Sequence, residues 1–357
     1  MRTLNLVVGF NSTGVGTLAE SYFLALREVC AREGAPFVVR HYNTDPESIA
    51  RLVRHQRPDD TTVFFWLYDP KVLEQIKTRL VLWMMFESTR LPSAWIARLS
   101  YFDQVWVSSR WGHDVLRANG FSGEVNVLAA GINPATFVPR DLEPAWAPGL
   151  RKLRVLMVGK LERRKGYDVA LYALARLSKE LPVTLVAKAD YFMFPERARQ
   201  LGTVAQSMGL DCELVSGKFS TEALAHLYRS GDLFLFPSRA EGFGLPCIEA
   251  LASGLPTLAT GYSGQTSFLD TIPGLYCEIR FDMAPLVDDD YAGFYRGIYG
   301  QEPFGEWAEP SPDSVVEGIR AIAADYPGWL QRAREAASVI RDRFSWQQVA
   351  HNSLLLL

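Results

Sequence analysis

The chain has 357 residues, of which 48% are hydrophobic and 22% are charged, a composition that fits a folded globular protein and excludes disordered and collagen-like chains. Its 37 basic and 40 acidic residues leave a formal net charge of −3, so the excess of positive charge typical of nucleic-acid-binding proteins is absent. The four cysteines lack zinc-ligand spacing and the apolar runs are too short to span a membrane, so we expect reduced cysteines and a cytoplasmic protein.

The N-terminal half alternates short apolar runs with helical patterns. Leu4–Val8 predicts a first strand rather than a signal peptide, and a glycine-containing loop leads to a helix over Thr17–Glu33. The further predicted strands are Phe37–Arg40, Thr61–Leu67, Val81–Phe86, Gln104–Val107 and Val125–Leu128, and the helices are Pro46–Arg54, Pro70–Thr78, Ala94–Leu99 and Trp111–Asn119. This alternation is typical of a parallel sheet covered on both faces.

The second half repeats the pattern after a proline-rich stretch, Asp141–Arg151, which is the best candidate for a linker. Its predicted strands are Arg154–Val158, Pro182–Ala187, Glu213–Ser216, Leu233–Phe236 and Thr257–Ala259, and its helices are Tyr167–Glu180, Arg197–Ser207, Thr221–Ser230, Pro246–Ala252, Ser314–Ala324, Pro327–Arg343 and a last one from Trp346. Arg280–Pro312 breaks the rhythm and is interpreted as an insertion or long loop. We predict two doubly wound α/β domains, 1–147 and 151–343, with ligands in a cleft between them.

The most informative stretch, Phe236–Pro256, reads FPSRAEGFGLPCIEALASGLP. A strand ends there, a tight loop places Glu241 beside glycines, and a helix follows with Pro246 at its first position. Because glycine admits a close ligand and helix starts attract anions, this loop predicts a phosphate site. Glu249, expected in the first helical turn, is interpreted either as an acceptor of hydrogen bonds from a ribose diol or as a complement to the helix dipole.

Four cations lie within six residues after the first strand of the second half, at Lys160, Arg163, Arg164 and Lys165. Lys160 follows a strand and Gly159, and Lys165 precedes a helix, so the two lysines are expected to bind the phosphates of a leaving nucleotide. For the two arginines a solvated loop is favoured.

A third segment, Gly9–Thr17, does not match the dinucleotide-binding pattern GxGxxG. Gly14 and Gly16 still predict a flexible turn at a helix start, and an ordinary tight turn is the competing interpretation.

Together these motifs resemble the retaining glycosyltransferases of family 4, which have the GT-B fold of two Rossmann-like domains facing a central cleft. The family's Glu-x7-Glu pair stands here as Glu241 and Glu249, and its basic pair as Lys160 and Lys165. The segments VLAAGINPATFVP and FSWQQVA resemble the end of the family's N-terminal domain and its closing helix. The resemblance covers essentially the whole chain and implies that the helix at about 344–357 packs back on the N-terminal domain.

The resemblance implies transfer of a hexose from a nucleotide-diphosphate sugar with retention of configuration, the donor on the C-terminal domain and the acceptor on the N-terminal one. It implies that Lys160 and Lys165 hold the diphosphate, Glu249 the ribose and Glu241 the sugar. The predicted donor-binding residues are Gly14, Gly16, Gly159, Lys160, Lys165, Glu241, Gly242, Phe243, Gly244, Leu245 and Glu249, and the predicted catalytic residues are Glu241, Lys165, Lys160 and Glu87.

Three positions depart from the family pattern. Lys160 replaces the usual arginine and loses its bidentate fork. Glu87 stands where the family offers a histidine, and it is interpreted as a general base, an acceptor for a sugar hydroxyl or a structural partner of Arg90. The family's later Gly-Gly-x-x-Glu is degraded to Ser263–Ser267.

No metal or cofactor is expected. Cleavage of the donor builds negative charge on the leaving phosphate, and the lysines and the helix start can stabilise it without a metal ion. No Asp-x-Asp follows a strand, and Asp288–Asp290 is interpreted as a solvated acidic patch.

Several alternatives stay open for the function. A nicotinamide-dependent enzyme would need GxGxxG and is disfavoured, whereas a non-catalytic nucleotide-sugar-binding protein on a decayed transferase scaffold is the main alternative. GDP-mannose is slightly favoured over UDP-sugars, because Trp307–Pro310 resembles a segment of mannosyltransferases of bacterial surface polysaccharides. The acceptor is a glycan, a lipid-linked glycan or a small molecule. Trp83–Trp111 either contacts a lipid-linked glycan peripherally at the inner membrane face or is ordinary core and surface.

Overall fold

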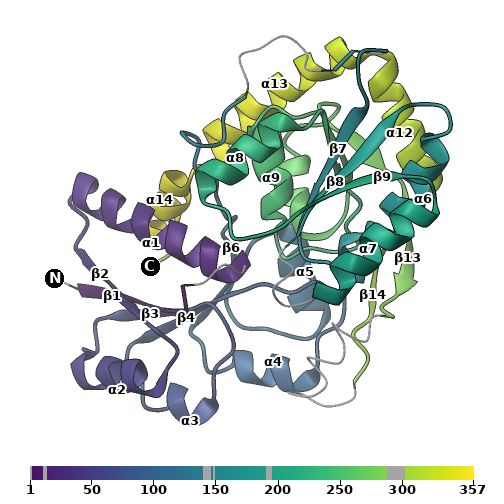
Figure 1. The fold of residues 1–357 in the computed structure, drawn as a ribbon. Helices are drawn as coiled ribbons and strands as arrows, with labels where there is room; N and C mark the ends of the chain where they lie inside the picture. The colour runs from purple at the N-terminus through teal and green to yellow at the C-terminus, as the bar shows by residue number, and fades with distance from the viewer. Residues whose placement is uncertain (1, 11–13, 140–145, 148, 190–194, 288–301) are drawn as a thin grey trace. The chain divides into compact units, whose positions relative to one another are not determined.

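The structure is a computed structural model that describes residues 2–10, 14–139, 146–147, 149–189, 195–287 and 302–357. It divides into two compact units (Figure 1). The first unit contains residues 1–131, 292–305 and 344–357, and the second contains residues 132–291 and 306–343.

The first unit contains a six-stranded parallel sheet in the order β2-β1-β3-β4-β5-β6. Its strands are β1 (Arg2–Val7), β2 (Phe37–Tyr42), β3 (Thr61–Phe64), β4 (Arg79–Met84), β5 (Gln104–Val107) and β6 (Val125–Val127), and its helices are α1 (Gly14–Glu33), α2 (Pro46–His55), α3 (Pro70–Leu73), α4 (Ser93–Leu99), α5 (Arg110–Ala118) and α14 (Trp346–Leu356). Five consecutive residues of β4, Leu80–Met84, are buried, because a parallel sheet with helices on both faces exposes neither side of its strands.

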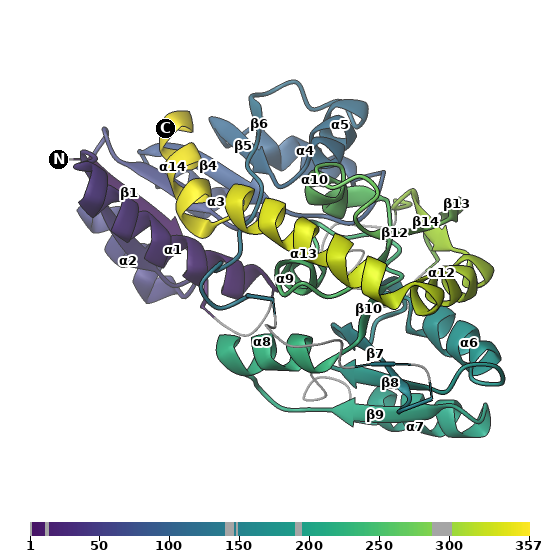
Figure 2. The ribbon, with the colours of Figure 1, turned by 90° about the horizontal axis from the view of Figure 1, so that it is seen from above.

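The last helix of the chain, α14, packs beside α1 at the N-terminal end (Figure 2). The Tyr22 hydroxyl donates a 2.7 Å hydrogen bond to Ser353 Oγ, and a side chain at Gly131 would lie 2.9 Å from the Trp346 ring. Helix α14 therefore contributes to the core of the first unit, together with α1.

The second unit contains another six-stranded parallel sheet, in the order β12-β11-β10-β7-β8-β9. Its strands are β7 (Leu153–Val158), β8 (Val183–Lys188), β9 (Asp211–Val215), β10 (Leu233–Phe236), β11 (Thr257–Thr260) and β12 (Cys277–Ile279), and its helices are η1 (Arg163–Lys165), α6 (Tyr167–Leu177), α7 (Pro195–Ser207), α8 (Thr221–Ser230), α9 (Leu245–Ala252), η2 (Ser263–Gln265), α10 (Thr266–Leu269), α12 (Pro312–Ala324) and α13 (Tyr326–Arg343). Local signals set many of these bounds; the Ser220 hydroxyl, for example, accepts a 3.2 Å hydrogen bond from the amide of Ala223 and caps α8. The predicted fold class, two doubly wound α/β sheets, is confirmed.

Each sheet reverses its winding direction between two neighbouring strands. In the first sheet the reversal lies between β1 and β3, and in the second it lies between β7 and β10. Ligands of doubly wound sheets bind outside the carboxyl ends of the strands at such a reversal, so both places are candidate sites.

Arg280–Pro312 was interpreted as an insertion or long loop, and at its two ends the loop alternative was wrong. Strands β13 (Phe281–Pro285) and β14 (Glu306–Pro310) pair antiparallel, with Met283 opposite Ala308. A hairpin is announced in sequence by a tight turn between its strands, and here twenty residues separate them. Asp288–Asp290, predicted to be a solvated patch, lie outside the described residues.

Two other predictions need correction. Helix α1 begins at Gly14 rather than at Thr17, so both predicted turn glycines lie in its first turn. The predicted linker Asp141–Arg151 is in part a packed segment, because Trp146 is buried and its indole donates a 3.1 Å hydrogen bond to the Arg151 carbonyl. Residues 141–145 of this linker lie outside the described part of the chain.

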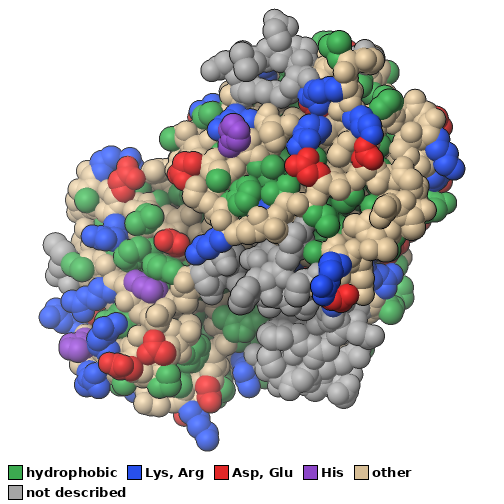
Figure 3. Space-filling view, viewed as in Figure 1, with side chains coloured by type: hydrophobic (Ala, Val, Ile, Leu, Met, Phe, Trp, Pro, Cys, Tyr) green, Lys and Arg blue, Asp and Glu red, His purple; other side chains and the backbone are tan. Residues whose placement is uncertain are grey.

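The tryptophans of Trp83–Trp111 are mainly core residues. Trp83, Trp95 and Trp106 are all buried, which favours ordinary core over membrane contact for this stretch. Among the described residues, no helix is both long enough and apolar enough to cross a membrane. The face drawn in Figure 3 carries basic and acidic side chains interspersed.

Candidate functional site

The basic turn after β7 is fixed against the end of β10 by a glycine. Gly166 ends η1 and precedes α6 with a φ of +74°, a conformation that glycine adopts without strain. A side chain there would also lie 2.0 Å from the Pro237 carbonyl oxygen. Both facts require glycine, and they bring the predicted lysine segment beside the predicted Glu241 loop.

Glu241 lies buried at the centre of this arrangement. Its carboxylate accepts hydrogen bonds from Lys165 Nζ at 2.6 and 2.8 Å, from an Arg164 guanidinium nitrogen at 3.0 Å and from Ser238 Oγ at 2.6 Å. Burial acts to raise the pKa of Glu241, but the charges of Lys165 and Arg164 outweigh it and lower that pKa to about 2. The carboxylate is therefore ionised at any physiological pH.

The ion pairs continue from Glu241 to Lys160. Arg164 also donates a 3.1 Å hydrogen bond to Glu162, and Lys160 Nζ lies 3.7 Å from the same carboxylate. We call these five residues, Lys160, Glu162, Arg164, Lys165 and Glu241, the ion cluster. Three cations face two carboxylates, so the cluster carries an excess of one positive charge.

Burial has the largest effect on the pKa of Lys165 in this cluster. The pKa of Lys165 is lowered, first by burial and then by the like charge of Arg164, and the carboxylates of Glu241 and Glu162 oppose that decrease. Gly159, also predicted to be a donor-binding residue, faces the aliphatic stem of Lys165, because a Cβ added at Gly159 would lie 3.5 Å from Lys165 Cδ. The predicted residues Gly159, Lys160, Lys165 and Glu241 are thus brought together.

The expectation that Arg164 is solvated was wrong. Its side chain is only 10% exposed, because it bonds Glu241, Glu162 and the Ala240 carbonyl at 2.8 Å. Arg163 remains about half exposed, as expected. Arg164 is buried and Arg163 exposed because the partners of Arg164, Ala240 and Glu241, come from the segment after β10. The local sequence around the two arginines does not contain these partners.

Helix α9 begins beside the cluster. Gly244 precedes it with a φ of +98°, and among the described residues no side chain caps its N-terminus. Its first residue is Leu245 and Pro246 is the second, one position later than predicted. The positive end of the helix dipole thus lies three residues from Glu241 and favours an anion there.

The backbone of the Glu241 loop is contacted by Ser263 and Gly264, which belong to the degraded family motif Ser263–Ser267. Ser263 has a φ of +63°, a strained conformation for a residue with a side chain, and its hydroxyl accepts a 2.8 Å hydrogen bond from the Glu241 amide. A side chain at Gly264 would lie 2.3 Å from the Gly242 carbonyl oxygen. Phe243 is buried and packs edge-on against Phe268, with 5.3 Å between the ring centres.

Glu249 lies in the second turn of α9, not in the first as predicted. Because the dipole effect falls off within the first turn, this position weakens the interpretation as a dipole complement. The Tyr228 hydroxyl donates a 2.9 Å hydrogen bond to Glu249. Burial raises the pKa of Glu249 to about 8, with the Tyr228 hydrogen bond opposing, so the two acids of the motif differ in protonation near neutral pH.

Sequence reasoning missed Arg239, whose side chain is 1% exposed. Its guanidinium bonds both oxygens of Asp168 at 2.9 Å and also bonds Glu309 of β14. Its amide donates a 2.7 Å hydrogen bond to the Arg164 carbonyl. Arg239 thereby links the β13–β14 hairpin and α6 to the basic turn. In the sequence, its position two residues before Glu241 is the feature that could have identified it.

The other predicted residues lie in the first unit. Gly14 opens α1 and is exposed, Gly16 is buried in its first turn, and Glu87 is half-buried between β4 and α4. Their roles, and the predicted cleft between domains, stay predictions.

The model of a family described as family 4 glycosyltransferases in conflict systems matches residues 113–352. The chain is 28% identical over 249 residues to the D-inositol 3-phosphate glycosyltransferase of Xylanimonas cellulosilytica, covering 66% of this chain and 52% of that protein. It is 35% identical over 156 residues to the mannosylfructose-phosphate synthase of Agrobacterium fabrum, covering 42% of this chain and 32% of that protein. The chain thus spans between a third and about half of the length of these curated relatives.

Among solved structures, the HepE protein of Anabaena in complex with UDP-glucose superposes with a TM-score of 0.68. The match covers 100% of both chains at 14% sequence identity, and it shows that the two chains share a fold.

Proposed function

The chain belongs to the family 4 glycosyltransferases, and from this premise we propose that it transfers a hexose from a nucleotide-diphosphate sugar to an acceptor, with retention of configuration and without a metal ion. The observation that carries the proposal is the ion cluster beside the uncapped start of α9. Its excess positive charge, held in a buried setting, suits a departing diphosphate. Lys160 is its most exposed cation, whereas the side chains of Arg164 and Lys165 are only 10% and 11% exposed.

The two acids would have different tasks. Glu241 is ionised and faces two cations, so it can stabilise the positive charge that develops on the donor sugar while its cations face the phosphates. Glu249 carries a proton near neutral pH and can exchange hydrogen bonds with ribose hydroxyls. Because Lys165 and Arg164 already occupy the oxygens of Glu241, we favour attack by the acceptor on the departing face over a covalent intermediate, in line with the family resemblance.

The donor is proposed from the relatives. The name of the Agrobacterium relative, at 35% identity, supports a mannosyl donor, whereas the UDP-glucose complex of HepE comes from a protein only 14% identical. We therefore favour GDP-mannose and keep UDP-sugars second. The resemblance of Trp307–Pro310 to mannosyltransferases adds little support for a mannosyl donor. Trp307 is buried and Glu309 pairs with Arg239, so packing and ion pairing already account for these two residues.

The test uses the full chain. Thermal melting with UDP-, GDP-, ADP- and TDP-sugars identifies the donor by the one that raises Tm, and release of nucleoside diphosphate from that donor without acceptor reports the chemical step. We expect GDP-mannose to stabilise the protein and to be hydrolysed slowly. A raised Tm without any release would instead support the non-catalytic nucleotide-sugar-binding alternative, and no shift with any donor would overturn the proposal.

A further inference from the structure

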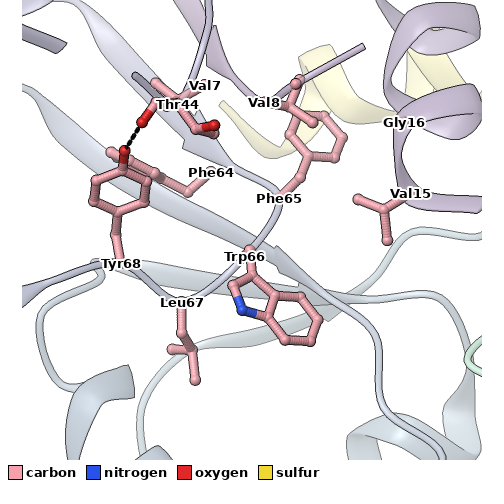
Figure 4. A pocket seen from close by; sticks show the side chains of 11 residues that line it. Val7, Val8, Val15, Gly16, Thr44, Phe64, Phe65, Trp66, Leu67 and Tyr68 are labelled. Carbon is pink, nitrogen blue, oxygen red and sulfur yellow. Dashed lines mark hydrogen bonds between the residues drawn. The ribbon is translucent and has the colours of Figure 1, made fainter. Parts of the chain in front are cut away.

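A cavity of about 360 Å³ lies in the first unit, remote in sequence from the ion cluster (Figure 4). Its walls come from the carboxyl ends of β1 and β3 and from the first turn of α1, including Val8, Val15 and Trp66. This is the point where the first sheet reverses its winding, the usual ligand position of such sheets. Its volume is at the small end of the range for ligand pockets.

The walls of this cavity are aromatic and uncharged. Four of its lining side chains are aromatic, and among the described residues that line it none carries a formal charge. The Tyr68 hydroxyl donates to the Thr44 carbonyl (Figure 4), and His41 Nε2 donates a 2.7 Å hydrogen bond to the Val8 carbonyl. These polar groups are therefore paired within the protein.

Trp66 supplies a partly exposed aromatic surface at the cavity. Its ring meets the buried Trp95 ring at 78°, 6.0 Å between centres, an arrangement that fixes the indole in place. Trp66 lies two residues after the end of β3, where the chain has left the sheet, so its side chain is not required to cover a neighbouring strand.

We propose that this cavity binds an apolar ring or chain of the acceptor, so that the acceptor is an uncharged hydroxyl compound with an aryl or alkyl group rather than a sugar phosphate. A phosphate ester would bring its charges into a cavity whose described lining offers no cation to compensate them, whereas burying an aromatic group against Trp66 is favourable. The inference rests on the proposed function, because a transferase that holds its donor at the ion cluster needs a second substrate site.

The test titrates the full chain, without donor, with phenyl α-D-mannoside, methyl α-D-mannoside and mannose 6-phosphate by calorimetry. We expect the phenyl glycoside to bind at least about tenfold more tightly than the methyl glycoside, and the phosphate to bind more weakly than the phenyl glycoside. Trp66→Ala should lower the phenyl glycoside affinity about tenfold and Trp66→Phe should restore most of it. Tyr101→Ala, which removes a partly exposed aromatic of the same unit outside the cavity, is the matched control and should leave the affinity unchanged.

A second variant guards against loss of folding. Val15→Trp places a larger side chain in the cavity from the start of α1, where Val15 is only partly buried, and it should abolish the preference for the phenyl group. Equal affinities for the two glycosides, tighter binding of the phosphate, or a phenyl preference that survives both Trp66→Ala and Val15→Trp would overturn the inference. The donor melting shift separates the two proposals. A donor shift without phenyl preference overturns only this one. A phenyl preference without a donor shift supports the apolar cavity as a binding site, but overturns the proposed function and with it the identification of the ligand as an acceptor.

Discussion

Lys165 donates hydrogen bonds to both carboxylate oxygens of Glu241, at 2.6 and 2.8 Å, although 76 positions separate the two residues. The pair joins the segments that follow β7 and β10, the neighbouring strands at which the second sheet reverses its winding. The chain therefore places an ion pair at the position where a sheet of this kind binds its ligand.

Removing the lysine should affect both stability and donor binding. In Lys165→Ala, Glu241 stays buried with Arg164 and Ser238 as partners, so we expect a loss of about 2–4 kcal/mol in the free energy of unfolding. Donor affinity and turnover should both fall, together by about a hundredfold in kcat/KM. Urea denaturation and initial rates measure the two effects. The control Lys152→Ala removes an exposed ion pair with Asp211 and should change neither; an unchanged donor affinity in Lys165→Ala would contradict the phosphate role.

Neutralising the acid should separate binding from chemistry. Glu241→Gln keeps the size and much of the hydrogen bonding of the side chain while the cluster gains one more net positive charge. We expect nucleoside diphosphate to bind at least as tightly as to the wild type, and turnover to fall about a hundredfold or more. Equilibrium titration and steady-state kinetics check this, with the exposed Glu317→Gln as control. Near-normal turnover would remove Glu241 from the mechanism.

The two acids predict opposite effects of pH on stability. The lowered pKa of Glu241, about 2, means that its contribution is present above about pH 4.5 and is lost as the pH falls toward 2. The raised pKa of Glu249, about 8, means that the folded chain keeps a proton that the unfolded chain has lost, so stability decreases as the pH rises from about 4.5 to 8.

Glu249→Gln tests the second of these effects, since the amide cannot titrate. The difference in unfolding free energy between variant and wild type should shift in favour of the variant between pH 5 and pH 8, as measured by urea denaturation at both values. A difference independent of pH would show that Glu249 titrates normally in the folded chain.

Arg239 should act as a positioning residue. In Arg239→Met, Asp168 and Glu309 lose their shared partner and the turn at 163–165 loses one anchor, so we expect a loss of about 3 kcal/mol in stability and faster hydrogen exchange of the amides near Lys165. Turnover should fall more than nucleotide affinity. The exposed pair of Arg320 with Glu180 offers the control Arg320→Met, which should cost less than about 1 kcal/mol. Unchanged exchange near Lys165 would argue against positioning.

Chelation tests the proposed use of cationic side chains. We expect donor hydrolysis to proceed at the same rate with and without EDTA, because the ion cluster and the start of α9 compensate the leaving phosphate. Loss of activity with EDTA and its recovery with Mg²⁺ would refute this.

The sequence alone determined most strands and helices of both sheets, although not the edge strand β12. It also determined the place of Glu241 and the basic turn and the resemblance to the family, because periodicity, glycines and motif spacing are local properties of a chain. Only the tertiary structure decided that Arg164 is buried, that Tyr228 binds Glu249, and that Arg239 bridges to a hairpin whose strands are some twenty residues apart. These contacts join residues that are distant along the chain. The burial and protonation of these residues depend on neighbours that come close only when the chain folds. The aromatic cavity of the first unit is of the same kind, since its walls become one surface only when β1, β3 and α1 meet.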